Sequence, residues 1–261
     1  MGRWDLKISV IILVHNNEKT IGKCLESVFS NKTLPYEIII VDNLSTDNSI
    51  SIIQSFSYEH FKIIRSKKNH IGYARNIGLK YARGNYVMFI DADDYVDVHL
   101  FETLLLYQGY DVIRFAPVLV DKDLFLYDNK FIYPLECSFK NGYEALKKFS
   151  VPELRYGVFW IYCFKNYDLK IRNFKIYEDT VSIPDIISKA KKVINLHYYG
   201  YYHVIHSNSY SSKISCEEKE RYFKKTCRYL IKRYYKHPII MKYYLYHFER
   251  KKLGRFKKAI N

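Results

Sequence analysis

The N-terminal third of the chain alternates between two hydrophobic periods. Four short runs are rich in β-branched apolar residues, as in strands buried on both faces, and they cover residues 7–14, 37–41, 61–65 and 86–90. Apolar residues at helical spacing follow the first three runs, in segments 16–31, 45–56 and 71–82. Strand–helix–strand repetition with short connections predicts a parallel sheet with right-handed crossovers. The pattern therefore predicts an α/β fold.

The boundaries of these helices and the second half of the chain give weaker signals. Ser45 or Thr46 is expected to cap the second helix, and Gly84 to stop the third. The elements expected further along are a helix over 98–107, paired strands over 111–133 with a turn near Asp128-Asn129, a helix from Asn141 to about 149, a helix beginning near Glu178-Asp179, strands around 192–205, and two helical segments in the C-terminal tail, the second opened by Pro238.

Length and composition limit the class of protein. The chain has 261 residues, 48% hydrophobic and 26% charged, which is typical of globular proteins. No apolar run approaches the roughly 18 residues of a membrane-spanning helix, and segment 6–15 lacks the cleavage site of a signal peptide. Five scattered cysteines, none in a C-x-x-C pair, argue for a reducing compartment and against structural zinc. We therefore expect a cytoplasmic protein with one large domain, or one domain plus an appendage.

The positive charge is concentrated at the C-terminus. The whole chain has 42 Lys/Arg and 27 Asp/Glu, a formal net charge of +15. Residues 211–261 hold 16 Lys/Arg and 4 Asp/Glu, so this tail alone carries +12 and the first 210 residues only +3. The main domain is therefore not itself strongly basic, and we expect no nucleic-acid partner.

Polar residues follow three of the predicted parallel strands. Asn16, Asp42 and Asp91 each lie at or just past a strand end. In sheets of this kind, ligands bind beyond the carboxyl ends of the strands. These residues are therefore candidates for one ligand-binding edge.

Asp91 and Asp93 form the stronger of two acidic pairs in the sequence. Like charges crowded at the end of a buried strand are unfavourable unless water, donors or cations compensate them, and divalent metals prefer such hard oxygen ligands. The plain alternative is an acidic turn that only ends the strand. A second pair, Asp121 and Asp123, also follows an apolar run, but we expect it on a solvated hairpin.

Asp42 and Arg75 each have two interpretations. Asp42 could complement the N-terminus of the following helix, or accept hydrogen bonds from a base or a ribose. Arg75, in the helix before the acidic strand, could be an ordinary surface arginine or could offset phosphate charge beside a metal-bound diphosphate.

Taken together, these segments resemble the family 2 glycosyltransferases with the GT-A fold. The motifs that carry the resemblance are, in order, SVIILVHNNEKTIGKCLESV, EIIIVDNLSTDNS, NHIGYARNIGLKYARGNYVMFIDADD, IYEDTVS and YYHVIHSNSYS. The similarity runs over about residues 7–211 and is densest through residue 97. It departs from the family pattern at Leu13, His15 and His203, where Pro, Tyr and Arg are usual. The implied fold is a Rossmann-like, mostly parallel sheet flanked by helices, with a small mixed β region on the acceptor side and a helical C-terminal tail.

The resemblance implies a role for each residue of the donor side. It places Asp42 against the nucleobase, Asn16 and Glu18 in the same pocket, and Arg75 near the nucleotide. Asp91 would contact ribose or metal. Asp93 would bind Mn²⁺ or Mg²⁺ bridging the diphosphate of a nucleotide-sugar, and a UDP-sugar is the expected donor.

On the acceptor side, the resemblance implies that Asp179 is the general base for an inverting transfer to a glycan or lipid-linked glycan, in surface polysaccharide synthesis. Glu178 is the alternative base, and the plain interpretation of both is a pair of carboxylates that complement a helix dipole. Trp160 is by default a core residue, although the family often places an acceptor-side aromatic nearby. His206 is by default an ordinary histidine, and an additional metal or diphosphate ligand is the alternative.

The tail, residues 213–261, mixes basic and aromatic residues and has two interpretations. Aromatic rings flanked by Lys and Arg suit the anionic inner face of the cytoplasmic membrane. Alternatively, the tail is a helical cap that packs on the catalytic domain. We expect this extension to follow a catalytic domain of residues 1–212, divided into a nucleotide-binding part, 1–97, and an acceptor-side part, 98–212.

Three rival functions remain open. A sugar-nucleotide nucleotidyltransferase usually has a Gly-rich phosphate loop near the start, which VHNNEKTIG lacks. A basic nucleic-acid-binding α/β protein would need its positive charge near the cleft, but the predicted cleft is lined by carboxylates. An inactive relative that only binds its ligand is the third.

Overall fold

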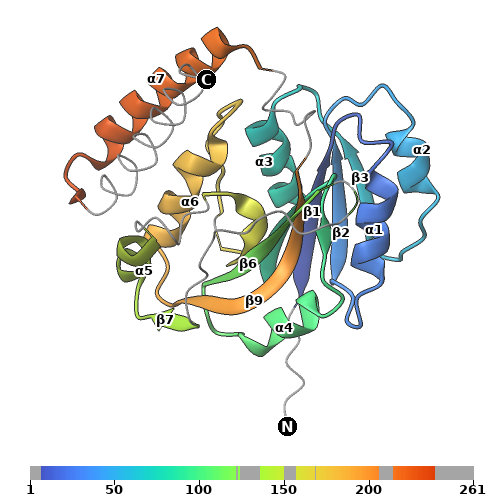
Figure 1. Ribbon diagram of the computed structural model, residues 1–261, viewed down its shortest axis with the longest axis horizontal. Coiled ribbons are helices and arrows are strands. Elements are labelled where there is room, and N and C mark those ends of the chain that lie inside the picture. The colour runs from blue at the N-terminus through green and yellow to red at the C-terminus, as the bar shows by residue number, and fades with distance from the viewer. Residues whose placement is uncertain are drawn as a thin grey trace.

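The structure is a computed structural model that describes residues 7–121, 123, 136–149, 157–167, 169–205 and 214–238. One twisted sheet runs through this part of the chain, in the order β3-β2-β1-β4-β8-β6-β9-β5, with β7 paired to β9 outside that path (Figure 1). The strands are β1 (Ile8–Val14), β2 (Glu37–Asp42), β3 (Phe61–Arg65), β4 (Tyr86–Asp91), β5 (Tyr95–Val96), β6 (Val112–Val120), β7 (Cys137–Phe139), β8 (Tyr162–Lys165) and β9 (Val193–Val204). The helices are α1 (Ile21–Phe29), α2 (Ser49–Gln54), α3 (Ile71–Tyr81), α4 (Leu100–Leu106), α5 (Gly142–Phe149), α6 (Glu178–Ser188) and α7 (Cys216–Tyr234), with a 3₁₀ turn, η2 (Phe159–Ile161).

The N-terminal half is the predicted parallel α/β unit. β3, β2, β1 and β4 pair in parallel, and the three helices between them are the predicted crossovers. Strands β1, β2 and β4 are almost wholly buried, which explains their continuous apolar runs. Figure 1 shows α1 and α2 on one side of this part of the sheet and α3 with α6 on the other.

The register brings the predicted polar residues to one edge. Val14 of β1 pairs with Asp42, and Leu13 pairs with Asp91. Asn16 lies two residues after the end of β1. The expectation that these strand ends meet at one edge is therefore confirmed.

The second half inserts an antiparallel strand into the sheet. β8 pairs antiparallel with both β4 and β6, so β6 runs in the same direction as β4, and β6 in turn pairs in parallel with β9. Asp121 therefore also follows a strand that ends toward the ligand edge, which the sequence did not indicate. Within the described residues β6 pairs with β8 and β9, and the turn expected near Asp128-Asn129 lies outside them.

The predicted cap of α2 is wrong. The helix begins at Ser49, with Asn48 in the N-cap position. Ser45 and Thr46 instead lie in the preceding loop, where their amides donate to the side chains of Asp42 and Asn16. The loop is held by these residues from β2 and the β1–α1 loop, so the helix starts only after it.

Gly84 is not a helix stop either. α3 ends at Tyr81 with Ala82 in the C-cap position. Gly84 lies where a Cβ would be 2.5 Å from the carbonyl oxygen of Lys7 and 2.7 Å from the amide of Ser9. The glycine is needed because two backbones approach closely there.

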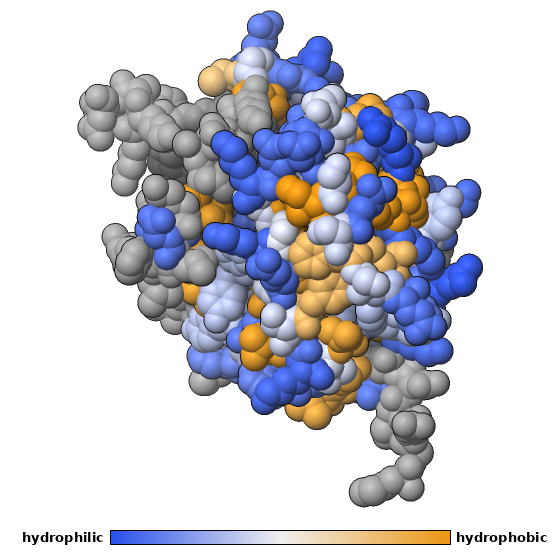
Figure 2. Space-filling model, turned by 90° about the vertical axis from the view of Figure 1, so that its right-hand side faces the viewer, coloured by the Kyte–Doolittle hydropathy of each residue, from blue (hydrophilic) through white to orange (hydrophobic). Residues whose placement is uncertain are grey.

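Aromatic side chains join α1, the turn after α2, and β3 on one face. The ring of Phe29 lies 5.7 Å from that of Phe56 and 6.4 Å from that of Phe61. Figure 2 shows this face, on which hydrophobic side chains gather among hydrophilic ones. These rings close the hydrophobic layer at the end of the sheet where β3 is the last strand.

α7 is the first of the two helical segments expected in the tail, and it packs on the domain. Ser215 caps it by accepting from the amide of Glu218, and Leu230 and Tyr234 are buried. The ring of Tyr229 meets that of Phe174 edge to face at 5.6 Å. No helix within the described ranges is long and apolar enough to span a membrane. Residues 239–261 lie outside the described part, and the domain boundaries at 97 and 212 stay predictions.

Candidate active site

Three acidic residues in the turn after β4 have different environments. Asp91 ends the strand, and its side chain is 31% exposed. Asp93 is partly exposed, whereas Asp94 is completely buried. The cluster therefore separates into two carboxylates that face the edge of the sheet and one that points into the protein.

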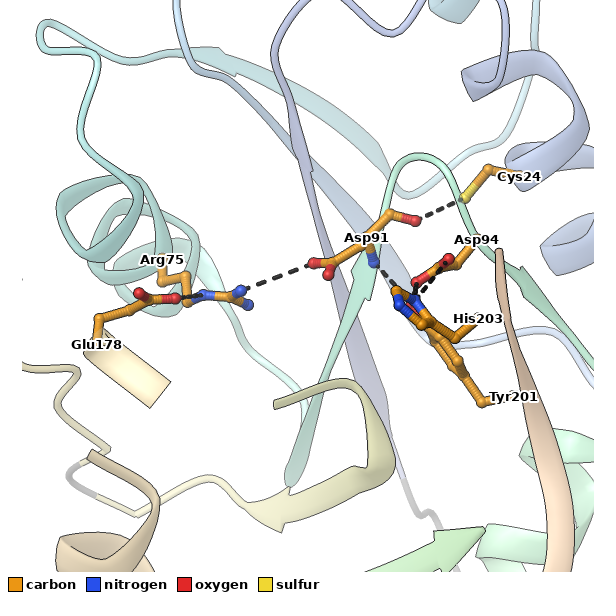
Figure 3. Close-up of polar contacts among 7 residues, drawn as sticks. All are labelled: Cys24, Arg75, Asp91, Asp94, Glu178, Tyr201 and His203. Atoms are coloured by element: carbon orange, nitrogen blue, oxygen red, sulfur yellow. Dashed lines mark hydrogen bonds and ion pairs between the residues drawn. The ribbon is translucent and has the colours of Figure 1, made fainter. Parts of the chain in front are cut away.

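Asp94 ties the acidic turn to β9. Its carboxylate accepts hydrogen bonds from the hydroxyl of Tyr201 at 2.8 Å, from the amide of Val204 at 2.9 Å, and from Nδ1 of His203 at 3.0 Å (Figure 3). The same tyrosine oxygen accepts from the amide of Asp91 at 3.0 Å. These bonds fix the turn that presents Asp91 and Asp93.

Trp160 packs against the two β9 side chains that bind Asp94. Its ring is stacked on those of Tyr201 and His203, with centroids 4.7 and 4.8 Å apart. The indole is only 4% exposed, whereas the side chain of His203 is 35% exposed. Burial alone would lower the pKa of His203, but the hydrogen bond and the charge of Asp94 raise it. The exposed ring at this position therefore belongs to His203, and the buried ring of Trp160 stacks on it.

Asp42 is a buried carboxylate at the end of β2. One oxygen accepts from the amide of Ser45 at 2.8 Å. The other, Oδ2, is buried without a hydrogen-bond partner among the described residues, and its nearest cation is Arg65, 3.6 Å away. Buried acceptors normally have a hydrogen-bond partner. A donor group on a bound ligand would provide one for Oδ2 of Asp42.

Asn16 and Glu18 hold the neighbouring loop. Oδ1 of Asn16 accepts from the amide of Thr46 at 2.8 Å, and Glu18 accepts from the amide of Asn48 at 3.1 Å. Asn16 and Leu44 both have positive φ, at 55° and 66°. Such strained backbone is usually kept at functional sites, so these two loops form a built edge around Asp42.

Arg75 connects the two halves of the site. Its guanidinium lies over the adjacent rings of Phe89 and Phe159, 5.1 and 4.8 Å from their centroids. Nε is 3.4 Å from Glu178 at the start of α6, and Nη2 is 3.7 Å from Asp91 (Figure 3). Arg75 is 4% exposed, so the surface-arginine interpretation is wrong.

Glu178 and Asp179 differ in accessibility. Burial and the charge of Asp179 raise the pKa of Glu178, although Arg75 opposes them. Burial also raises the pKa of Asp91, although the positive charge of Arg75 lowers it in part. Asp179 is partly exposed and accepts from the amide and hydroxyl of Thr180. Tyr177, which precedes the pair, has a positive φ of 65°.

The carboxylates at this edge fit a divalent cation only together with a ligand. Within the described part of the chain, no three His, Cys, Asp or Glu side chains converge as a metal site. Mg²⁺ is commonly bound by one or two carboxylates plus substrate phosphates, and Asp91 and Asp93 can supply these. His206 lies outside the described residues.

Two residues of the site, Asp94 and Tyr201, are hydrogen-bonded partners that the sequence does not predict. Asp94 stands beside the acidic pair in sequence, but nothing in the sequence distinguishes it from Asp93. A tyrosine and a histidine at alternate positions of β9 point to the same face, and this is the only signal that the sequence offers.

Comparison with known proteins identifies the family of the chain. A family model described as "Glycosyl transferase family 2" matches residues 9–165, more than half of the chain. The poly(ribitol-phosphate) beta-glucosyltransferase of Bacillus spizizenii is 27% identical over 246 residues, covering 84% of this chain but only 35% of that protein. The cholesterol galactosyltransferase of Borreliella burgdorferi is also 27% identical over 246 residues, covering 87% of this chain and 68% of that protein.

A solved structure shares the fold. The structure of S. aureus TarS 1–349 in complex with UDP-GlcNAc has a TM-score of 0.73 and 19% identity, covering 94% of this chain and 73% of that one. This similarity confirms the expected GT-A fold. The family match over more than half of the chain means that the chain belongs to glycosyl transferase family 2.

Proposed function

We propose that this protein transfers a sugar from a nucleotide-sugar, most simply a UDP-sugar, to a glycan or lipid-linked glycan of a surface polysaccharide. The observation that carries this proposal is the single edge of the sheet that holds buried Asp42 and, two strands away, Asp91 and Asp93. One carboxylate suits a nucleobase and the other two suit a metal-bound diphosphate. The similarity in fold to TarS with UDP-GlcNAc supports a donor of this kind.

In this mechanism the chain's own residues bind the donor and move one proton. Asp42 accepts hydrogen bonds from the base, and Asn16 and Glu18 hold the loop beside it. Mn²⁺ or Mg²⁺, held by Asp93 and Asp91, would supply Lewis-acid stabilisation of the leaving diphosphate.

Asp179 removes the proton from the acceptor hydroxyl as that oxygen attacks the anomeric carbon, and the single displacement inverts configuration. Asp179 is a better base than Glu178 because its side chain is partly exposed, whereas Glu178 is buried against Arg75. The acceptor therefore approaches from the side of α6, where the carboxylate of Asp179 is accessible.

Thermal unfolding with nucleotides tests the donor site. We expect UDP with Mn²⁺ to raise the Tm of the wild type by several degrees, because a ligand at a hundredfold its Kd stabilises by about 2.7 kcal/mol. The shift should disappear with chelator and in Asp93→Ala. Asp123→Ala removes an aspartate of the other acidic pair and should keep the shift.

Each contrary outcome has a definite meaning. If the Tm shift is lost in Asp123→Ala but kept in Asp93→Ala, the metal site must be assigned to Asp121 and Asp123 instead. If no nucleotide shifts Tm with any metal, the proposed donor site is wrong. Steeply salt-dependent binding to DNA or RNA in that case would favour the nucleic-acid alternative.

We also propose that α7 brings the protein to the anionic inner face of the cytoplasmic membrane. Its exposed side carries Lys224, Arg228 and Lys232, together with the exposed apolar surfaces of Ile231 and Tyr235. Each basic residue near such a surface contributes about 1 kcal/mol, so changing the three to glutamine should weaken binding to anionic vesicles on the order of 100-fold.

Co-sedimentation with phosphatidylglycerol vesicles measures this effect. The matched control replaces three exposed lysines elsewhere, Lys23, Lys32 and Lys80, with glutamine. Equal loss of binding in both triple variants would mean that net charge alone, and not α7, attracts the protein to the membrane.

A further inference from the structure

Asn76 of α3 forms hydrogen bonds to a backbone segment from the other half of the chain. Its amide oxygen accepts from the amide of Ile171 at 3.0 Å, and its nitrogen donates to the carbonyl of the same residue at 2.8 Å. The side chain thus satisfies both backbone groups of one residue that lies 95 positions away. This geometry needs the donor and the acceptor of a carboxamide together.

Gly72, one helical turn earlier, lets the same segment come close. A Cβ at this position would lie 2.7 Å from the carbonyl oxygen of Arg172 and 3.0 Å from that of Phe174. Both are backbone atoms, so any larger residue would push segment 171–174 away from α3. Gly72 and Asn76 are four residues apart and therefore lie on one face of the helix.

Arg75 extends this contact to the start of α6. Its Nε lies 3.4 Å from Glu178, immediately before Asp179, and the rings of Phe89 and Phe159 hold its guanidinium in place. Three residues of one helix, Gly72, Arg75 and Asn76, therefore hold segment 171–178 at both of its ends. We call these three residues the α3 clamp.

The clasped segment is in turn fixed to α6. The amide of Arg172 donates to the hydroxyl of Ser182 at 2.8 Å, and its guanidinium lies 2.6 Å from Asp185. Between the segment and the helix stands Tyr177, with its positive φ of 65°. A displacement of segment 171–174 would therefore be transmitted to the helix that begins with Glu178 and Asp179.

We propose that the α3 clamp positions Asp179 for proton removal and that Gly72 and Asn76 do so without contributing to nucleotide affinity. The inference rests on the proposed function, because it takes Asp179 as the base. It changes the expected role of the Gly-x-Ala-Arg-Asn motif: Gly72 and Asn76 contact the acceptor-side segment, and Arg75 reaches Glu178 as well as Asp91.

Asn76→Ala tests the clamp without touching the donor edge. We expect turnover of the UDP-sugar at saturation, measured as UDP release, to fall by about 100-fold, as displacements near 1 Å can produce. The Kd for UDP with Mn²⁺ should stay within about twofold of wild type, and hydrogen exchange should accelerate at the amides of residues 171–181. Asn76→Asp keeps the hydrogen bond from the amide of Ile171 but loses the one to its carbonyl. Its turnover should therefore lie between those of the wild type and Asn76→Ala.

Two matched controls separate positioning from general loss of stability. Asn166 is a partly exposed asparagine that donates to the backbone carbonyl of Gly84 at 2.9 Å, so Asn166→Ala removes a similar bond elsewhere. Gly22 is the second residue of α1 as Gly72 is of α3, but its added Cβ would meet only Ile52 at 3.6 Å. We expect Gly72→Ala to behave like Asn76→Ala, and Gly22→Ala and Asn166→Ala to keep wild-type turnover.

The outcomes distinguish this inference from the proposed function. If the Kd for UDP rises in parallel with the loss of turnover, or if Asn166→Ala loses as much as Asn76→Ala, the positioning role is wrong. Unchanged exchange at 171–181 in Asn76→Ala would also overturn it. If the wild type neither binds nor turns over a UDP-sugar, the proposed function is wrong, and so is the role of the clamp in positioning a base. The hydrogen-exchange data would still show whether the α3 clamp holds segment 171–178.

Discussion

Replacing Asp179 with asparagine is expected to lower kcat by about 100- to 10,000-fold, the usual contribution of a general base. Asparagine cannot take the proton, but its amide oxygen can still accept from the amide and hydroxyl of Thr180, as Oδ1 of Asp179 does. The start of α6 should therefore stay in place. We expect the Kd for UDP with Mn²⁺ and the Tm to remain close to wild type.

Glu178→Gln is the matched comparison, because it makes the same chemical change one position earlier. Its buried side chain faces Arg75, so the change should lower kcat less than Asp179→Asn does. A reversed order, with the larger loss in Glu178→Gln and unchanged nucleotide affinity, would assign the base to Glu178. Loss of UDP binding in Asp179→Asn would place this aspartate in the donor site instead.

Removal of Asp94 should cause the largest loss of stability. Asp94→Ala leaves the hydroxyl of Tyr201, the amide of Val204 and the imidazole of His203 without their shared acceptor. Breaking a buried pair in this way costs about 3 kcal/mol, the lower end of the usual range, since the side chain of His203 is 35% exposed and retains some water. At this chain length the Tm should fall by about 6–12 °C in calorimetry.

Asp93→Ala is the control for this loss, since it removes the same group from the adjacent position. Asp93 is partly exposed, so its substitution should change stability by no more than about 0.5 kcal/mol while it abolishes the metal-dependent nucleotide shift. The two variants should thus separate folding from ligand binding. Equal Tm values for Asp93→Ala and Asp94→Ala would show that the hydrogen bonds of Asp94 contribute little.

The part of the site that the sequence predicts is the part set by strand direction. A pattern of parallel strands brings the residues after each strand to one edge, so the order of strands and helices along the chain is enough to place Asn16, Asp42 and Asp91 together. The direction of β6 could not be predicted, because it depends on β8, a strand from much later in the chain that inserts beside β4.

The contacts that the sequence could not predict join distant residues. The contact between Asn76 and Ile171 spans 95 positions, and that between Arg75 and Glu178 spans 103. Hydrophobic periodicity gives information only about neighbouring residues, so it cannot predict either contact. The sequence misplaces the cap of α2 for a related reason: Ser45 and Thr46 have the right chemistry for a cap, but Asp42 and Asn16 bind their amides first.

The distance between Asp94 and its partners has a consequence for synthesis. The hydroxyl, imidazole and amide that bind its carboxylate come 107 to 110 residues later in the chain. At about 5–20 residues per second, a ribosome needs roughly 5–20 s to make that stretch. During this interval the nascent chain already carries the acidic turn, but the strand that buries its third carboxylate has not been made. A chain cut after residue 165, where the family match ends, keeps Asp91 and Asp93 but lacks both the proposed base and the strand that holds the turn.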